Sequence, residues 1–311
     1  MNILITGIHG FVGSNLVAAL KTKHTIYGLD IVSPAKGGVE KTFTWNELDT
    51  LPAIDVVIHL AGKAHDTKNQ TNAQVYFDIN TELTQKIYDW FVESEAKKFI
   101  FFSSVKAAAD RVETDILTED IVPTPKGPYG ESKIAAEKYI LSHSSGHNTQ
   151  NYYILRPCMI HGPGNKGNLN LLYNVVKKGI PYPLGAFENR RSFTSIDNLS
   201  FVIGKLIQTD ISSGIYNVAD DENLSTNELI ALISKVLNKS DRIWNWNASV
   251  IRFCAQVGTK FHLPLNNERL QKLTENYVVS NAKLKKALGI EKMPVSSKEG
   301  FTKTIKSFEN L

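Results

Sequence analysis

Two side chains that could share a proton stand four residues apart in the segment GPYGESK, residues 127–133. If this segment begins a helix, Tyr129 and Lys133 lie on the same face, with Cβ atoms about 5–6 Å apart. A free tyrosine has a pKa near ~10, and a neighbouring ammonium lowers it by roughly 1–3 units. Tyr129 could then act as a general base near neutral pH. An exposed Tyr–Lys pair also occurs by chance, so the interpretation depends on the rest of the chain.

A second candidate site is the glycine-rich segment that begins at Thr6. It lies between an apolar run and a helical pattern, which is the context of a dinucleotide-binding loop. Glycines there permit a tight turn and let backbone N–H groups approach a pyrophosphate at the positive end of a helix. We therefore predict that this loop binds the cofactor through Gly7, Gly10, Phe11, Val12 and Gly13.

The next apolar run ends in a carboxylate, Asp30, 17 residues past Gly13. Such a carboxylate can bind both ribose hydroxyls of NAD and would repel the 2′-phosphate of NADP. Ile31 and Val32 follow and provide no arginine for that phosphate. The sequence therefore favours NAD. The alternative is that the glycines serve only helix–sheet packing and that Asp30 is solvated.

The order of the elements predicts the fold class. Short apolar runs alternate with helical patterns of about 10 to 15 residues, which indicates βαβ units and a parallel sheet. VVIHL and FIFF are apolar at successive positions, as in strands covered on both faces. We expect an α/β protein with a Rossmann-type doubly wound parallel sheet in residues 1–160. A smaller α/β substrate-binding lobe is expected in 161–311, although FTSI and IYNVA could rejoin the first domain.

Composition limits the classes of partner and compartment. The 311 residues are 42% hydrophobic and 21% charged, with a net charge of +4 and interspersed signs, so no nucleic-acid stripe is indicated. A mildly positive chain suits a small anionic substrate. Cys158 and Cys254 form no zinc or disulfide pattern, which favours a reducing cytoplasm. The histidines have no metal-binding spacing, and no apolar run reaches the ~20 residues of a membrane span.

In combination, four motifs resemble the extended short-chain dehydrogenase/reductase family. They are TGxxGxxG, Asp30, HLAG at 59–62 and PYGESK, and they are most similar to its nucleotide-sugar epimerase/dehydratase branch, in particular to UDP-glucose and UDP-N-acetylglucosamine 4-epimerases. The resemblance implies an NAD-dependent enzyme in which Tyr129 and Lys133 are the YxxxK pair and Ser104 supplies the catalytic hydroxyl. By the same resemblance, Ala61, Gly62 and Lys63 line the cofactor.

The resemblance leaves the reaction open. Dehydratases of the branch carry an Asp-Glu pair after the serine position, whereas this chain has Val105 and Lys106, so dehydration is disfavoured. The first expectation is 4-epimerisation of a UDP-hexose or UDP-N-acetylhexosamine. An NAD(P)H-dependent 4-ketoreductase of a UDP-4-keto-6-deoxy-N-acetylhexosamine, in surface-polysaccharide synthesis, is the alternative. A non-catalytic nucleotide-binding regulator is the third possibility.

The resemblance also implies residues for the nucleotide end of the substrate. Asn168 and Arg191 correspond to family positions that bind the diphosphate, and Arg269 is a further candidate ligand. Arginine suits this role because its planar fork makes paired, charge-assisted hydrogen bonds. Homodimers are common among such relatives, so a homodimer is a possible assembly.

Overall fold

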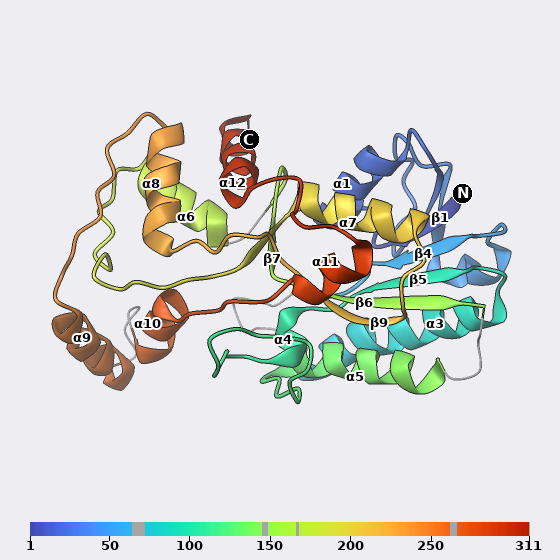
Figure 1. Cartoon of the computed structure of the whole chain (residues 1–311), viewed down its shortest axis with the longest axis horizontal. Coiled ribbons are helices and arrows are strands. Elements are labelled where there is room, and N and C mark those ends of the chain that lie inside the picture. The colour runs from blue at the N-terminus through green and yellow to red at the C-terminus, as the bar shows by residue number, and fades with distance from the viewer. Residues whose placement is uncertain (64–71, 145–148, 166–167, 262–265, 311) are drawn as a thin grey trace.

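A seven-stranded parallel sheet forms the centre of the larger lobe in the computed structural model, which describes residues 1–63, 72–144, 149–165, 168–261 and 266–310 (Figure 1). The strand order is β3-β2-β1-β4-β5-β6-β9, and every neighbouring pair is parallel. The strands are β1 (Asn2–Thr6), β2 (Thr25–Asp30), β3 (Lys41–Thr44), β4 (Val56–His59), β5 (Lys98–Phe102), β6 (Asn151–Pro157) and β9 (Gly214–Val218).

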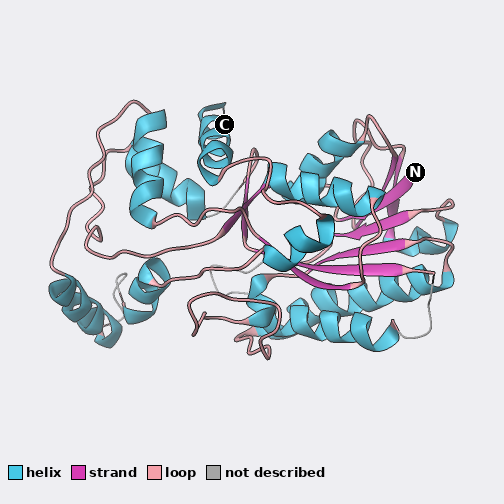
Figure 2. Cartoon of the chain, in the orientation of Figure 1, coloured by secondary structure: helices cyan, strands magenta, loops and turns pink. Residues whose placement is uncertain are grey.

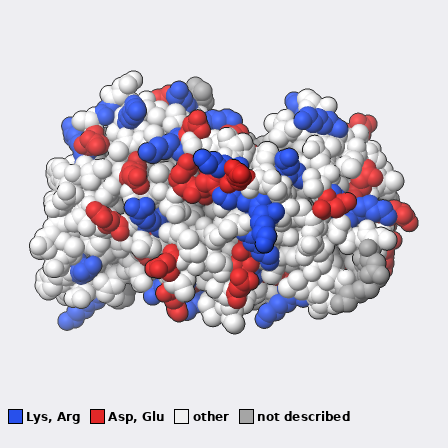
Figure 3. Space-filling model, viewed as in Figure 1, with Lys and Arg blue, Asp and Glu red and all other residues white. Residues whose placement is uncertain are grey.

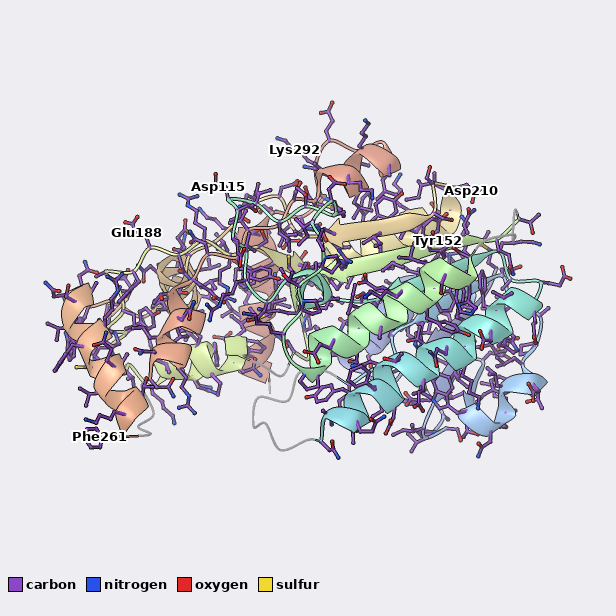
Figure 4. All side chains as sticks on the ribbon, turned by 90° about the horizontal axis from the view of Figure 1, so that it is seen from below. Asp115, Tyr152, Glu188, Asp210, Phe261 and Lys292 are labelled. Carbon is purple, nitrogen blue, oxygen red and sulfur yellow. The ribbon has the colours of Figure 1, made fainter. Side chains whose placement is uncertain are left out.

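Helices cover both faces of this sheet. One face packs against α1 (Phe11–Leu20), α7 (Ile196–Gln208) and α11 (Ala282–Leu288), and the other against α3 (Leu83–Glu93) and α5 (Pro128–His143). Figure 4 shows α3 and α5 side by side across the second face. All residues of β4 and β5 are buried, which explains their continuous apolar runs. The predicted fold class, a Rossmann-type doubly wound sheet, is confirmed.

The second lobe is smaller and mainly helical (Figure 2). Its core joins side chains of α6 (Asn168–Lys177), α8 (Thr226–Val236) and α12 (Ser297–Ser307). Two further helices, α9 (Ala248–Lys260) and α10 (Asn267–Thr274), contribute to a separate small cluster. A separate two-stranded parallel sheet is formed by β7 (Met159–His161) and β8 (Phe193–Ser195).

The segments after residue 190 contribute to both lobes. IYNVA contains most of β9, which pairs with β6 at the edge of the main sheet, and α7 covers that sheet. FTSI instead provides β8, which pairs with β7. The chain therefore crosses between the lobes more than once.

The remaining short elements lie around the carboxyl edge of the sheet and at the end of the chain. They are η1 (Trp45–Thr50), α2 (Ala73–Phe77), the π-helical η2 (Asp78–Glu82), α4 (Val105–Ala108) and η3 (Phe308–Asn310). None of the helices in the described ranges is long and apolar enough to cross a membrane.

Candidate active site

The predicted cofactor and catalytic segments follow the carboxyl ends of four neighbouring strands. The glycine loop follows β1, Asp30 ends β2, the segment 61–63 follows β4, and Ser104 comes two residues after β5. In a doubly wound sheet ligands bind at this edge, where the strand order changes direction. Here the change falls between β1 and β4.

Close backbone packing explains the glycines of the loop. Gly7 has φ +66°, and a Cβ on it would lie 2.9 Å from the amide nitrogen of Ala61. A Cβ on Gly13 would lie 2.7 Å from the carbonyl oxygen of Gly7. The buried hydroxyl of Thr6 accepts a hydrogen bond from the Ala61 N–H at 2.9 Å. The loop is thus held against the segment after β4, and both can contact one ligand.

The start of α1 fits the phosphates of a dinucleotide. Gly10 precedes the helix and provides no side-chain cap, so the first N–H groups of the helix have no side-chain partner there. Phe11 and Val12 form the first turn and are half-buried. Backbone N–H groups at the positive end of a helix suit an anion.

Asp30 lies beside the glycine loop, as predicted. Its carboxylate accepts hydrogen bonds from the N–H of His9 at 3.1 Å and from that of Ile31 at 2.8 Å. Lys36, which the sequence analysis missed, donates to the Ile8 carbonyl and the Ser14 hydroxyl, both at 2.7 Å. No sequence motif marks Lys36, because its contacts depend on how the loop after β2 folds back.

The structure brings Ser104, Tyr129 and Lys133 together. Ser104 caps α4, accepting the N–H of Lys106 at 3.2 Å, and its hydroxyl donates to the Tyr129 hydroxyl. Tyr129 lies in the first turn of α5, and Lys133 follows one turn later. The Lys133 ammonium donates to the carbonyl of Phe102 at 2.8 Å, at the end of β5. Strand β5 and helix α5 therefore position the three side chains.

The pKa of Tyr129 differs from the expected direction. Burial raises it, the hydrogen bond from Ser104 partly opposes this rise, and the nearby Tyr76 adds to it. Burial also lowers the pKa of Lys133 to about 8, against the opposing charge of Glu137. Burial of the phenolate therefore dominates in the protein without cofactor. The lowering of this pKa by Lys133 and by the positive charge of NAD stays a prediction for the loaded site.

Asn80 connects the segment after β4 to the catalytic helix. Its side chain accepts the N–H of Lys63 at 2.8 Å and donates to the Ser132 hydroxyl at 3.0 Å. A Cβ on Gly62 would lie 2.9 Å from the Asn80 oxygen and 3.0 Å from the Lys133 nitrogen. Asn80 belongs to the π-helical turn η2, a deviation often found at functional sites. Gly62, in the middle of the predicted segment 61–63, thus lies next to Lys133.

A buried ion pair supports this helix from behind. Arg156 on β6 donates to Glu137 on α5 at 2.5 and 2.9 Å, and Ser103 donates to the same carboxylate. Both members of the ion pair are almost inaccessible to solvent. The sequence signal for this pair was Glu137, one turn after Lys133 on the helix, but its buried partner comes from the next strand, 19 residues further on.

Arg191 lies near the segment that carries the catalytic serine, as its neighbours show. Arg191 is half-buried, and its charge acts on Cys158 and Tyr277. The Tyr277 hydroxyl donates to the carbonyls of Val105 and Ala109, in and just after the helix that Ser104 caps. Arg191 is therefore close to the segment that carries the catalytic serine.

The other two substrate candidates are less closely connected to this cluster. Asn168 is the first residue of α6, and its side chain lies outside the described residues. Arg269 is exposed on α10, and its backbone N–H donates to the side-chain oxygen of the capping residue Asn266 at 2.9 Å. The same helix is joined to the loop after α4 by a hydrogen bond from Arg111 to Gln271.

The residues after Ser104 provide no acid–base pair. Val105 is buried, and Lys106 donates to the carbonyl and the carboxylate of Asp110. In the described part of the chain, no three His, Cys, Asp or Glu side chains form a group that could hold a metal ion.

The doubly wound sheet and the residues at its carboxyl edge define a dinucleotide-dependent enzyme of the dehydrogenase type. Residues 3–219 match the NAD dependent epimerase/dehydratase family, and the chain belongs to that family. The predicted resemblance and the predicted cofactor, NAD, are confirmed at this level. The glycine loop, the α1 terminus and Asp30 fit that cofactor.

Relatives agree with this assignment. The chain is 30% identical over 324 residues to a UDP-glucose 4-epimerase of Vibrio cholerae, covering 99% of this chain and 95% of that one. It is 28% identical to the N-acetyl-alpha-D-glucosaminyl-diphospho-ditrans,octacis-undecaprenol 4-epimerase of Escherichia coli O157:H7, over 76% and 73% of the two chains. The solved UDP-N-acetylglucosamine 4-epimerase of Bacillus cereus has the same fold, with TM-score 0.78, 20% identity and 99% coverage of both chains.

Proposed function

We propose that this protein is an NAD-dependent nucleotide-sugar 4-epimerase that acts on a UDP-hexose or a UDP-N-acetylhexosamine. The observation that carries the proposal is the Ser104–Tyr129–Lys133 cluster, beside a loop that fits NAD and without the carboxylates that dehydration requires. The full-length similarity to a UDP-glucose 4-epimerase supports the reaction and the nucleotide.

In this proposal Tyr129 is the general base. Its hydroxyl oxygen takes the proton of the sugar 4-hydroxyl and returns it after the 4-keto sugar has turned over. Ser104, which donates to that same hydroxyl, would hydrogen-bond the sugar oxygen as it becomes a carbonyl. NAD held by the glycine loop, Asp30 and the segment 61–63 would supply the acceptor and donor of the C4 hydride and would add a positive charge to the site.

Because the pKa of Tyr129 is raised, the site with NAD and substrate bound must provide positive charge near its hydroxyl. Burial disfavours the phenolate, so positive charge must stabilise it. Lys133 is the cation one turn away, and its ammonium is already held by the Phe102 carbonyl. A lysine whose pKa is about 8 keeps most of its charge at neutral pH.

The binding residues follow from the same arrangement. We assign NAD to the larger lobe, through the glycine loop, Asp30 and the segment 61–63. The diphosphate of the substrate is assigned to Arg191 and Asn168, with Arg269 as a further candidate. We also propose that residues 1–160, together with β9 and α7 from the later part of the chain, form the NAD-binding domain, and that residues 161–311 provide most of the substrate contacts.

Two assays test this function. Denatured protein is examined for released nucleotide by chromatography and absorbance, and native protein is incubated with UDP-glucose or UDP-N-acetylglucosamine while the C4 epimers are followed by NMR. An epimerase must recover its own reducing equivalent, so it should retain near-stoichiometric NAD or NADH and interconvert one pair of sugars. Empty protein that interconverts neither pair would contradict the proposal.

The 4-ketoreductase is retained as a second candidate because SSVKAAAD lacks the Tyr-Gly of the epimerase sequence SSxxVYG. A reductase must exchange its cofactor in every cycle. Protein that purifies empty, binds added NADH or NADPH and oxidises it in the presence of a UDP-4-keto-6-deoxy-N-acetylhexosamine would support it.

A further inference from the structure

Helix α9 carries an apolar stripe on its outer side. Val250, Phe253 and Phe261 are 54%, 64% and 65% exposed, and Val257 lies between them at helical spacing. The opposite side of the helix is already used, because Ile251 and Ala255 are buried in a small cluster with residues outside α9. We call the four outward residues the α9 stripe. Val257 is half-buried and the Lys260 ammonium lies 6.0 Å from the centroid of the Phe261 ring, but Val250, Phe253 and Phe261 remain more than half exposed. An apolar stripe exposed to this extent indicates a surface that can bind a partner.

Two tryptophans extend the exposed apolar surface on the segment before the helix. Trp244 and Trp246 stack with ring centroids 6.2 Å apart and are 48% and 53% exposed. Every Trp and Phe side chain that is exposed in the described part of the chain falls within residues 244–261. Such a concentration marks an interaction surface rather than the scattered apolar exposure of an ordinary protein surface.

The same region holds most of the excess positive charge of the chain. Residues 242–261 contain Arg242, Arg252 and Lys260 and no acid, a net charge of +3, whereas all 311 residues together carry +4. In Figure 3, the end of the molecule where α9 lies shows blue and white atoms.

We propose that this end of the molecule, formed by the α9 stripe and the two tryptophans, docks on an anionic lipid bilayer. Apolar side chains on one side of a helix with cations beside them bind in the interface of a membrane without crossing it. Tryptophan rings prefer the headgroup level, and anionic lipids attract lysine and arginine. Lys260, the last residue of α9, is exposed and is one of these cations.

The shape of the molecule agrees with this orientation. Helix α9 lies at the end of the smaller lobe that is farthest from the main sheet, and Phe261 projects at the tip in the turned view (Figures 1 and 4). Contact through this tip would hold the sheet and α5 away from the bilayer. A second copy of the chain is a poorer occupant, because it would bring the same positive charge against itself.

The test uses the full-length protein and sedimentation with vesicles. One set contains phosphatidylcholine only, and the other contains phosphatidylcholine with about a third phosphatidylglycerol. We expect binding to the anionic vesicles, a blue shift of tryptophan fluorescence on binding, and weaker binding as salt screens the charge. Absence of binding to the anionic vesicles at low salt would overturn the proposal.

Variants locate the contact. Phe253→Ser combined with Phe261→Ser should weaken partitioning by about tenfold or more, since two apolar anchors are lost. Lys260→Glu should weaken it as well, whereas Lys97→Glu, a matched reversal of an exposed lysine on the larger lobe, should not. Thermal melting and cofactor content serve as folding controls for all three proteins.

Two outcomes would overturn the proposal. If the double serine variant binds vesicles as the wild type does, the α9 stripe is not the contact. If the wild type ignores vesicles but sediments as a dimer that the double variant dissociates, the surface joins two copies of this chain. The first result overturns docking through the α9 stripe, and the second overturns lipid docking itself.

Discussion

Tyr129 experiences opposing effects that no single residue determines. Burial and Tyr76 raise the pKa of its hydroxyl, while the donated hydrogen bond of Ser104 lowers it. The ring of Tyr76 packs edge-on, with centroids 6.5 Å apart. Desolvation therefore favours the neutral phenol in the cofactor-free site. Positive charge must offset this effect before Tyr129 can act as a base.

Replacement of Tyr129 by phenylalanine tests its role directly. The variant lacks the proton acceptor but keeps the ring and its packing, so we expect kcat to fall by about 10²–10⁴ with cofactor content unchanged. Tyr139→Phe is the matched control, because that hydroxyl lies on the same helix and donates to Asp89 at 2.6 Å, away from Ser104. Steady-state kinetics of both variants would decide, and unchanged turnover in Tyr129→Phe would rule out the general base.

Lys133 gives a pH dependence with a defined sign. Its pKa falls from 10.5 to about 8 on folding, so between these values the unfolded chain binds the extra proton. Stability then increases with pH through this window, and the cost of the buried ammonium is fully present below pH 8. In cofactor-free protein, the free energy of unfolding should rise by up to about 3 kcal/mol from pH 7.5 to 10.5 relative to Lys133→Met. Denaturant titrations at both pH values measure this, and parallel behaviour of the two proteins would contradict it.

At the scale of elements, the segment after β4 is positioned by contacts that exclude a side chain. Gly62 lies where any Cβ would press on both Asn80 and Lys133. Asn80 in turn joins this segment to α5 through Ser132. The glycine therefore allows a loop, a π-helical turn and the catalytic helix to meet at one point.

We expect Gly62→Ala to reduce the free energy of unfolding by about 1–3 kcal/mol and to lower the NAD content of the purified protein. The reason is that the new methyl group displaces the Asn80 amide or the Lys133 ammonium. Gly204→Ala is the control, because nothing lies within 4 Å of a Cβ at this position in α7. That change should stabilise the protein by about 0.5–1 kcal/mol. Equal effects of the two substitutions would refute the steric argument.

At the scale of the whole molecule, the sheet depends on both halves of the chain. Strand β9 covers the edge of β6, and α7 supplies Leu199, Val202 and Ile203 to the core beneath the sheet. The first 160 residues alone would leave that edge unpaired and that face without its helix. The lobes therefore do not correspond to two independent stretches of sequence.

A fragment of residues 1–160 should consequently fail to fold cooperatively. Circular dichroism and size-exclusion chromatography should show a poorly structured or aggregated chain, because the fragment lacks β9 and α7. The full-length protein provides the reference transition. A fragment with a sharp thermal transition and bound NAD would show that the first lobe is an independent domain.

The sequence alone was sufficient to predict what depends on local pattern. Successive apolar residues indicated the buried strands β4 and β5, because both faces of a parallel sheet are covered. Three local motifs could be recognised in the same way: the glycine loop, Asp30 at the end of a strand, and the Tyr129–Lys133 pair. Each depends on the turn, strand or helix geometry of a short stretch of chain. Together they predicted the fold class, the cofactor and the family.

Only the tertiary structure decided what depends on desolvation and on distant partners. It showed that burial raises the Tyr129 pKa in the protein without cofactor, and burial is a property of the packed site and not of the spacing between Tyr129 and Lys133. It also revealed Lys36 beside the glycine loop and Arg156 beneath the catalytic helix. These contacts join residues that are far apart along the chain, and a single sequence carries no local signal for such distances.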